Sequence, residues 1–189
     1  FLDMGSTHAF YTIMCRKPRG RKFVASYFIW QGLQFLLPLI FIGLLFPEQW
    51  IYQIWIGQEK GMILLAFVAV FMKDNAWVTM SNIGESFRLT HKVQIFNLSI
   101  VVTHFLLVVV LFWTQHLSLY VLFGLIFIEY LIATCVAFHV LCGNRLKDEE
   151  FDGKKVWNEY FNFCAPLILY SWLGFGSLFA DRWFLQAFG

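Results

Sequence analysis

Five runs of mostly apolar residues fill the greater part of this chain. A helix needs roughly 20 such residues to cross the hydrocarbon layer of a membrane. The runs cover residues 23–46, 61–83, 93–113, 117–142 and 160–180, and residues 1–15 have the composition of the end of an earlier helix. The sequence therefore predicts an all-α, polytopic transmembrane bundle of about six helices.

Composition supports this class of protein. Hydrophobic residues make up 59% of the 189 residues and charged residues only 14%. In a soluble domain about a quarter of all residues are charged. The chain begins at Phe1 rather than at a methionine, and we expect it to be a piece of a longer protein. The polar connection 143–159 is the longest linker, so it is the best predicted boundary.

Basic residues predict the orientation. Eleven of the 14 Lys and Arg residues fall in the connections 15–22, 86–92 and 143–159, which lie on one side of the membrane, and the connections of the other side carry Lys60. Loops rich in Lys and Arg stay in the cytoplasm. We therefore expect a multi-pass protein of the plasma membrane, with membrane lipids around it. We read the net charge of +2 as this asymmetry and not as a nucleic-acid site.

Lys73, Asp74 and Asn75 follow directly on the apolar run 62–72. Charges inside the hydrocarbon layer are costly, and they usually face the interior of a bundle or a water-filled pathway. The alternative is a Lys73 side chain that reaches up to the headgroups. Lys73 lies about 12 residues into its helix, roughly 18 Å at 1.5 Å per residue, which is deep for that reach. We therefore favour a cavity-lining role.

The polar residues of this helix recur at helical spacing, which predicts two stripes. One stripe holds Asn75, Thr79, Asn82 and Ser86, and the adjoining stripe holds Lys73, Trp77, Ser81 and Glu85. In the preceding helix Gln31 and Gln34 share a face. Hydrogen bonds between helices explain these two amides as well as a substrate does.

Glu129 stands among apolar residues in the run 117–142. An apolar setting favours the uncharged form of a carboxyl group. Glu129 is thus either a proton or ion carrier or a carboxyl neutralised by a neighbouring helix, with Lys73 as one partner to consider. We expect His104 and His139 to be packed, hydrogen-bonded residues rather than proton carriers.

No nucleotide, zinc-protease or serine-hydrolase motif occurs in the sequence. The four cysteines have no metal-type spacing, so we expect them to be apolar fillers. We predict neither a cofactor nor a metal site, and we expect no enzymatic activity.

Two stretches resemble the bacterial exporters of O-antigen and other lipid-linked oligosaccharides. These polysaccharide flippases belong to the multidrug/oligosaccharidyl-lipid/polysaccharide exporter superfamily. Residues 1–10 are similar to the "DxG…A" end of the second helix of these proteins, through Asp3, Gly5 and Ala9. Residues 165–169 (APLIL) and 180–189 (ADRWFLQAFG) are similar to the start and end of the seventh helix.

This resemblance implies two six-helix bundles arranged as a V around a central cavity. Residues 1–142 would be part of the first bundle, 143–159 a cytoplasmic linker, and 160–189 the first helix of the second bundle. The implied activity is the flipping of an undecaprenyl-pyrophosphate-linked oligosaccharide across the inner membrane for lipopolysaccharide synthesis. A coupling ion, proton or sodium, would be a further partner.

The expected substrate cavity combines a cation for the pyrophosphate with aromatic and amide groups for the sugars. Its predicted residues are Lys73, Asp74, Asn75, Trp77, Thr79, Gln31 and Gln34. Glu129, Asp181 and Arg182 are predicted as coupling or gate residues, although an ion pair with a structural role explains Asp181 and Arg182 slightly better.

Two other functions stay open. A drug or cation exporter of the same superfamily would use Glu129 and Asp74 as its central residues. A multipass enzyme acting on lipid-linked sugars would need catalytic groups on an outer loop, where the sequence offers mainly Glu48, Glu59 and His116.

Overall fold

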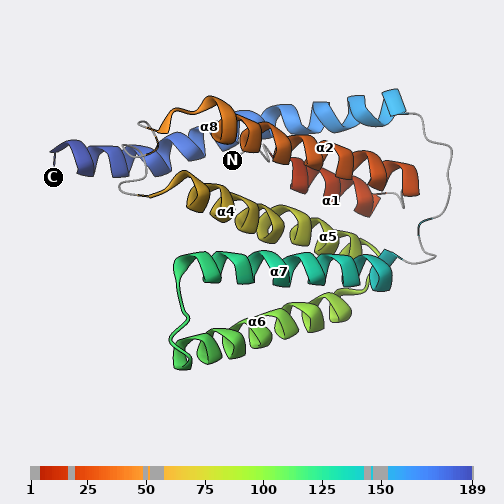
Figure 1. Cartoon of the computed structure of the whole chain (residues 1–189). Helices are drawn as coiled ribbons and strands as arrows, with labels where there is room; N and C mark the ends of the chain where they lie inside the picture. Colours follow the sequence, from red (N-terminus) through yellow and green to blue (C-terminus); the bar gives the residue numbers. More distant parts are fainter. Residues whose placement is uncertain are drawn as a thin grey trace.

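The computed structural model describes residues 5–16, 20–48, 51, 58–142, 146 and 153–188. Six helical rods make up this part of the chain, and three of them contain a π-helical segment (Figure 1). The rods are α1 (Ser6–Arg16), α2 (Arg21–Ile40) with η1 (Phe41–Leu45), α4 (Lys60–Phe71) with η2 (Met72–Trp77) and α5 (Val78–Ser86), α6 (Thr90–Trp113), α7 (Leu119–Ala137) with η3 (Phe138–Cys142), and α8 (Gly153–Phe188). The all-α class is confirmed.

Four of the rods are long and apolar enough to cross a membrane. They cover Arg21–Leu45, Lys60–Ser86, Thr90–Trp113 and Leu119–Cys142, with lengths of 25, 27, 24 and 24 residues. Large apolar side chains are exposed along them, as Leu98, Val101 and Phe105 are on α6. These features are those of a multipass membrane protein. The fifth expected span, 160–180, falls within α8, where many side chains lie outside the described part.

The helices stand side by side in a row. In Figure 1 the α4–α5 rod lies between the α1–α2 pair and α7, with α6 on the far side of α7 and α8 beyond α1 and α2. α4 and η2 pack against α7, α1 packs against α5 and α8, and α6 packs against α5 and α7. The α4–α5 rod is therefore the centre of the described bundle.

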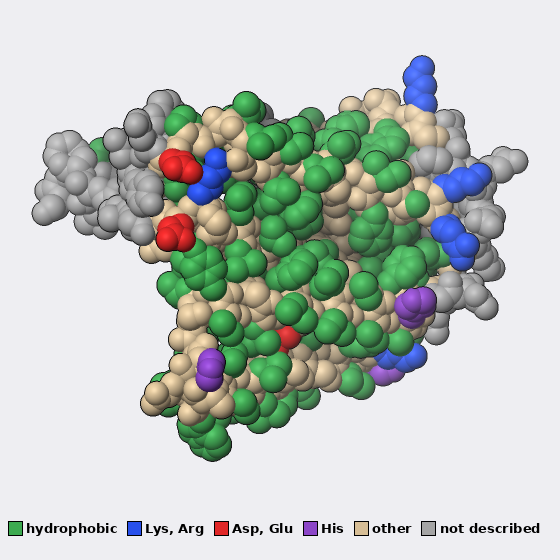
Figure 2. Space-filling view, in the orientation of Figure 1, with side chains coloured by type: hydrophobic (Ala, Val, Ile, Leu, Met, Phe, Trp, Pro, Cys, Tyr) green, Lys and Arg blue, Asp and Glu red, His purple; other side chains and the backbone are tan. Residues whose placement is uncertain are grey.

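Most of the described basic side chains lie at one end of the helices, and the exceptions are Lys60 and Lys73. α1, α5 and η3 end there and α2, α6 and α8 begin there, with Arg16, Arg21, Lys22, Arg88 and Lys92 on these termini. In Figure 2 most of the Lys and Arg side chains lie at this end, whereas acidic side chains with a basic neighbour lie near the opposite end. We call the half of the bundle next to the basic termini the basic half. That this end is cytoplasmic stays a prediction.

The basic half also holds most of the described core. Its buried side chains come from α1, the first turns of α2, α5, η3 and the start of α8, with Phe10, Tyr27, Met80, Leu141 and Tyr160 among the largest. In the opposite half η1 has no buried residue and α4 has Ala69 alone. We call this second half the sparse half.

Two glycines permit close helix contacts in the core. A Cβ atom on Gly84 of α5 would lie 2.6 Å from Val93 of α6 and 2.9 Å from Leu141 of η3. A Cβ atom on Gly5 would lie 2.6 Å from Leu167 of α8, and the backbone of Gly5 has a φ of +75°. Side chains at these positions would push the helices apart.

α8 begins earlier than the apolar run suggests. It starts at Gly153 rather than near Tyr160, so the second part of the predicted linker 143–159 is helical. Val156, Tyr160 and Cys164 are buried at intervals of four residues, which places them on one face of the helix. This face packs on the core and extends the helix into the polar sequence. The predicted division into two bundles stays a prediction.

Candidate functional site

Polar residues from four helices lie near the middle of their membrane-length spans. Lys73 is 13 residues from each end of the span Lys60–Ser86, or roughly 20 Å at 1.5 Å per residue. Gln31, His104 and Glu129 occupy similar central positions in the spans Arg21–Leu45, Thr90–Trp113 and Leu119–Cys142. Since the hydrocarbon core is about 30 Å thick, this depth is its centre. We call these residues and their hydrogen-bond partners the mid-span polar layer.

The charged part of this layer sits in a π-helical segment. η2 covers Met72–Trp77 and carries Lys73, Asp74 and Asn75 between two ordinary α-helices. The side chains of Lys73 and Asp74 are exposed, and that of Asn75 is half-buried. Single π-turns inside α-helices occur frequently at functional sites. The exposed pair of opposite charges at mid-span is the strongest candidate for a substrate contact.

A hydrogen-bonded contact joins α2 to the centre of the bundle. The Gln31 amide nitrogen donates to the Thr79 hydroxyl oxygen at 2.6 Å and to the Asn75 carbonyl oxygen at 3.3 Å. Gln31 is 3% exposed and Thr79 is fully buried. Gln34, one turn further along α2, is also buried. The interhelical hydrogen bond, one of the two explanations for the Gln31 amide, is thus present.

Trp77 faces a different pair of helices. Its indole nitrogen donates to the Asn97 side-chain oxygen at 2.9 Å, and its ring makes edge contacts with Phe96 and Tyr130. Trp77 is 5% exposed. Trp77 therefore packs against α6 and α7, whereas Thr79 packs against α2 and Lys73 is exposed at the surface. The three residues do not line one common site.

Glu129 is paired with His104 across the α6–α7 interface. His104 Nδ1 lies 2.7 Å from Glu129 Oε2, and the two side chains are 33% and 8% exposed. The other carboxyl oxygen of Glu129, Oε1, is buried without a hydrogen-bond partner among the described residues. The partner of Glu129 is therefore His104 and not Lys73.

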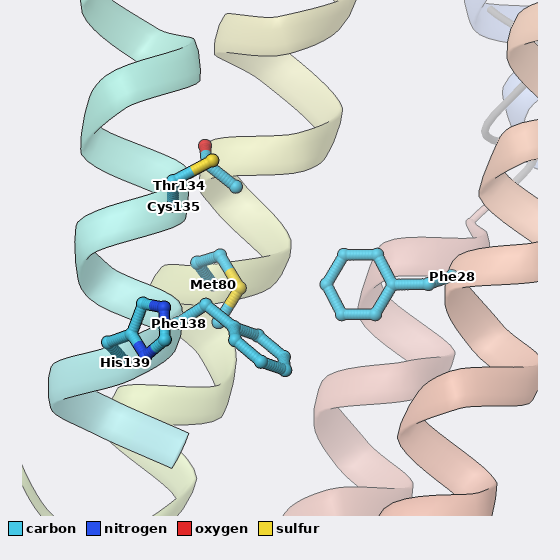
Figure 3. A pocket seen from close by; sticks show the side chains of 6 residues that line it. All are labelled: Phe28, Met80, Thr134, Cys135, Phe138 and His139. Atoms are coloured by element: carbon cyan, nitrogen blue, oxygen red, sulfur yellow. The ribbon is translucent and has the colours of Figure 1, made fainter. Parts of the chain in front are cut away.

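Two hollows lie between α2 and the α4–α5 and α7 rods. The first, of about 280 Å³, is in the basic half, and Phe28 of α2 faces Met80 and Phe138 across it (Figure 3). The second, of about 420 Å³, is in the sparse half and is lined by Ile42, Gln58, Met62, Ile63, Ala66, Phe67, Val70 and Phe123. Both hollows are mostly apolar.

Between the hollows α2 touches the central rod. This contact is made by the Gln31–Thr79 hydrogen bond and by Phe35, whose ring lies 4.8 Å from that of Phe71 and 5.8 Å from that of Phe67. Thr134 lines the first hollow, and its hydroxyl oxygen is buried without a partner in the described part of the chain.

Asp181 and Arg182 lie in the last two turns of α8. Their side chains are outside the described residues, so their predicted gate role stays a prediction. The proposed ligand roles of Lys73, Asp74, Asn75, Trp77, Thr79, Gln31 and Gln34 stay predictions too. The structure brings Gln31, Asn75 and Thr79 together.

Asn97 and the pairing of His104 were missed by the sequence reasoning. A signal for both was present, because Val93, Asn97, Ile100 and His104 recur at intervals of four, three and four residues. Such spacing marks the helix face that packs against a neighbour. Two polar residues on that face of an otherwise apolar helix predict polar partners on the facing helix.

No protein-family model, curated protein or solved structure matches this chain. The resemblance to the polysaccharide flippases therefore remains an interpretation of the two short motifs.

Proposed function

We propose that this chain acts in a membrane transporter that carries a negatively charged, lipid-linked substrate across the bilayer. The observation that carries the proposal is the exposed Lys73–Asp74 pair in η2, at the middle of a membrane-length helix. Leaving such charges in contact with lipid tails is unfavourable, so they call for a polar occupant or water. A substrate with a charged headgroup that passes through the bilayer is such a polar occupant.

The more specific proposal is a flippase for undecaprenyl-pyrophosphate-linked oligosaccharides of the inner membrane. It rests on the motif resemblance and on the chemistry of the layer. The Lys73 ammonium suits a pyrophosphate, and the nearby amide of Asn75 suits sugar hydroxyls. The lipid chain of such a substrate stays in the bilayer while its headgroup crosses.

The arrangement of the two hollows supports alternating access as the mechanism. Each hollow lies on one side of the contact that Gln31, Thr79 and Phe35 make between α2 and the central rod. In the proposed cycle, α2 moves away from this rod to connect the hollows. Gln31 and Thr79 then exchange their mutual hydrogen bond for bonds to the passing headgroup.

A cation exporter is the second candidate, and Asp74 is the observation that favours it. Asp74 is exposed at mid-span, as Lys73 is. A cavity built around Asp74 and Glu129 would select positive charge rather than phosphate. Under either candidate the chain is proposed to be a transporter and not an enzyme.

The test uses the full-length protein in proteoliposomes that contain a fluorescent pyrophosphate-linked oligosaccharide. Flipping is measured as the fraction of headgroups that a membrane-impermeant quencher reaches. We expect Lys73→Ala to lower the rate at least tenfold and Lys73→Arg to keep part of it, since the charge stays while the geometry changes. Lys22→Ala, at the exposed start of α2, is the matched control and should flip normally.

Each outcome decides between the candidates. A normal rate for Lys73→Ala would contradict the flippase proposal. The same vesicles loaded with a cationic dye test the second candidate, because its transport should then depend on Asp74 and be lost in Asp74→Asn.

A further inference from the structure

The His104–Glu129 pair has no role in holding the proposed headgroup. It joins the outermost helix of the row, α6, to α7 near the centre of both spans (Figure 1). A carboxyl group in such a place normally has every oxygen satisfied, because an unpaired buried polar atom is costly. Glu129 has one oxygen bound to His104 and one buried oxygen, Oε1, without a partner in the described part.

We propose that the His104–Glu129 pair is a proton-binding site that takes up and releases one proton. Two hydrogen-bond arrangements fit the 2.7 Å separation. Either His104 Nδ1–H donates to a carboxylate, or a protonated Glu129 donates to Nδ1. The contact between the helices therefore survives in both protonation states.

The charge balance of the pair determines when the proton is held. A neutral imidazole beside a carboxylate has a charge of −1, and one added proton brings the pair to zero. The added proton is held by Glu129, whose carboxyl group then donates to His104 Nδ1, and no other reactant is needed. A low dielectric favours the neutral pair, and wetting of the site favours release of the proton to water.

The two side chains differ in access. A third of the His104 side chain is exposed, but only 8% of the Glu129 side chain is. His104 Nε2, the ring nitrogen not bonded to Glu129, is the atom through which a proton can pass to water that reaches the site. Glu129 then holds the proton, and His104 passes the proton to and from Glu129.

The other titratable groups around α7 are placed differently. The elements packed against it, α4, η2, α6 and η3, carry Lys60, Lys73, Asp74, His91, Lys92, His104, His139 and Cys142. On α7 itself are Tyr120, Tyr130 and Cys135. Of these groups only His104 forms a hydrogen bond with Glu129.

Electrostatics connects the pair to η2. η2, which carries Lys73 and Asp74, packs against α7, which carries Glu129. A negatively charged headgroup beside Lys73 would disfavour a second negative charge on Glu129. Substrate binding and proton binding would then strengthen each other. This link to transport rests on the proposed function, whereas proton binding itself does not.

The test therefore measures proton binding by Glu129 in the absence of any substrate. Infrared spectra of the purified full-length protein, recorded over a pH series, follow the C=O stretch of a protonated carboxyl group. We expect a titrating band that is absent in Glu129→Gln, a variant that still accepts the hydrogen bond from His104. In His104→Gln the midpoint should move by about one pH unit or more, because the basic partner is lost.

Two controls are matched in residue type. Glu59 and His116 lie outside the spans and are exposed, so Glu59→Gln and His116→Gln should leave the band unchanged. The proposal is overturned if the band persists in Glu129→Gln, if no band titrates in the parent protein, or if His104→Gln leaves the midpoint in place. Should Glu129→Gln fail to fold, the His104→Gln midpoint still decides.

Failure of the proposed function gives a different result. A normal infrared titration together with absent flipping would reject the flippase and retain the proton site. Flipping that is normal in Glu129→Gln, with the band lost, would retain both activities and overturn only the link between them.

Discussion

The two halves of the bundle are built differently. In the basic half, aromatic and aliphatic side chains of α1, α2, α5, η3 and α8 form a continuous core. In the sparse half, η1 buries no residue and α4 buries Ala69 alone. The helices there meet through ring contacts such as Phe35–Phe67 and through side chains near the ends, such as Tyr120 and Glu59.

The mid-span polar layer lies at the border between these halves. Most of the buried contacts between helices lie in the basic half, and α2 with η1 has few of them in the sparse half. Few buried side chains are what a moving element needs, because a segment with few buried apolar contacts separates at low cost. The difference between the halves is therefore the structural counterpart of the proposed alternating access.

The largest effect is expected from removing an aromatic ring in the basic half. Phe10 is fully buried, and its ring lies 4.0 Å from that of Tyr27 and 5.6 Å from that of Phe23. Phe10→Ala should lower the free energy of unfolding by about 3–5 kcal/mol, because it removes these contacts and leaves a cavity. Unfolding is measured by titration with denaturing detergent, followed by tryptophan fluorescence.

Phe41 is the matched position in the sparse half. It is 53% exposed and contacts Phe46 with ring centroids 5.7 Å apart. Phe41→Ala should cost less than about 1 kcal/mol. Equal losses for the two variants would mean that the sparse half is as firmly packed as the basic half, and the comparison would fail.

An intermediate effect is expected from adding a methyl group. Gly84→Ala places its Cβ atom against Val93 and Leu141 and should cost about 1–3 kcal/mol, the usual range for overpacking. At Gly124 of α7, a Cβ atom would have no neighbouring atom within 4 Å. Gly124→Ala should be neutral or stabilise the helix by up to about 1 kcal/mol. The measurement is again detergent unfolding, and a harmless Gly84→Ala would show that α5, α6 and η3 can separate at no cost.

The helices themselves were predictable from the sequence. Apolar runs gave the four spans to within a few residues, because hydrocarbon thickness sets helix length. The start of α8 was missed, since its first turns carry Lys154 and Lys155 and resemble a linker. Only the spacing of Val156, Tyr160 and Cys164 pointed to a helix with one buried face.

The arrangement of the polar layer was only partly predictable. Lys73 and Trp77 are four residues apart and were expected on one stripe, but one is exposed and the other is buried between α6 and α7. Both residues lie in the π-segment η2, whose wider turn changes the register between the faces of α4 and α5. No composition signal marks that turn, and the pairing of His104 with Glu129 depends on how two helices pack.

The smallest effect is expected from a Tyr→Phe substitution, which can be made once in each half. The Tyr160 hydroxyl contacts the hydroxyl of Ser6 and lies 3.4 Å from the Ser6 carbonyl oxygen, and it is buried with Tyr27 at the junction of α8 with α1 and α2. Tyr160→Phe should cost about 1–2 kcal/mol, because Ser6 loses a buried partner.

The corresponding change in the sparse half is Tyr120→Phe. The Tyr120 hydroxyl donates to Glu59 at 2.8 Å, but both residues are exposed, and water can replace the lost bond. The expected cost is therefore below about 0.5 kcal/mol. The free energy of unfolding of both variants is measured under the same conditions. The flipping rate of each variant is a second measurement. If Tyr120→Phe instead destabilised the protein by more than Tyr160→Phe, the Tyr120–Glu59 bond would be a latch that holds the sparse half together, and the movement of α2 would have to begin at the basic half.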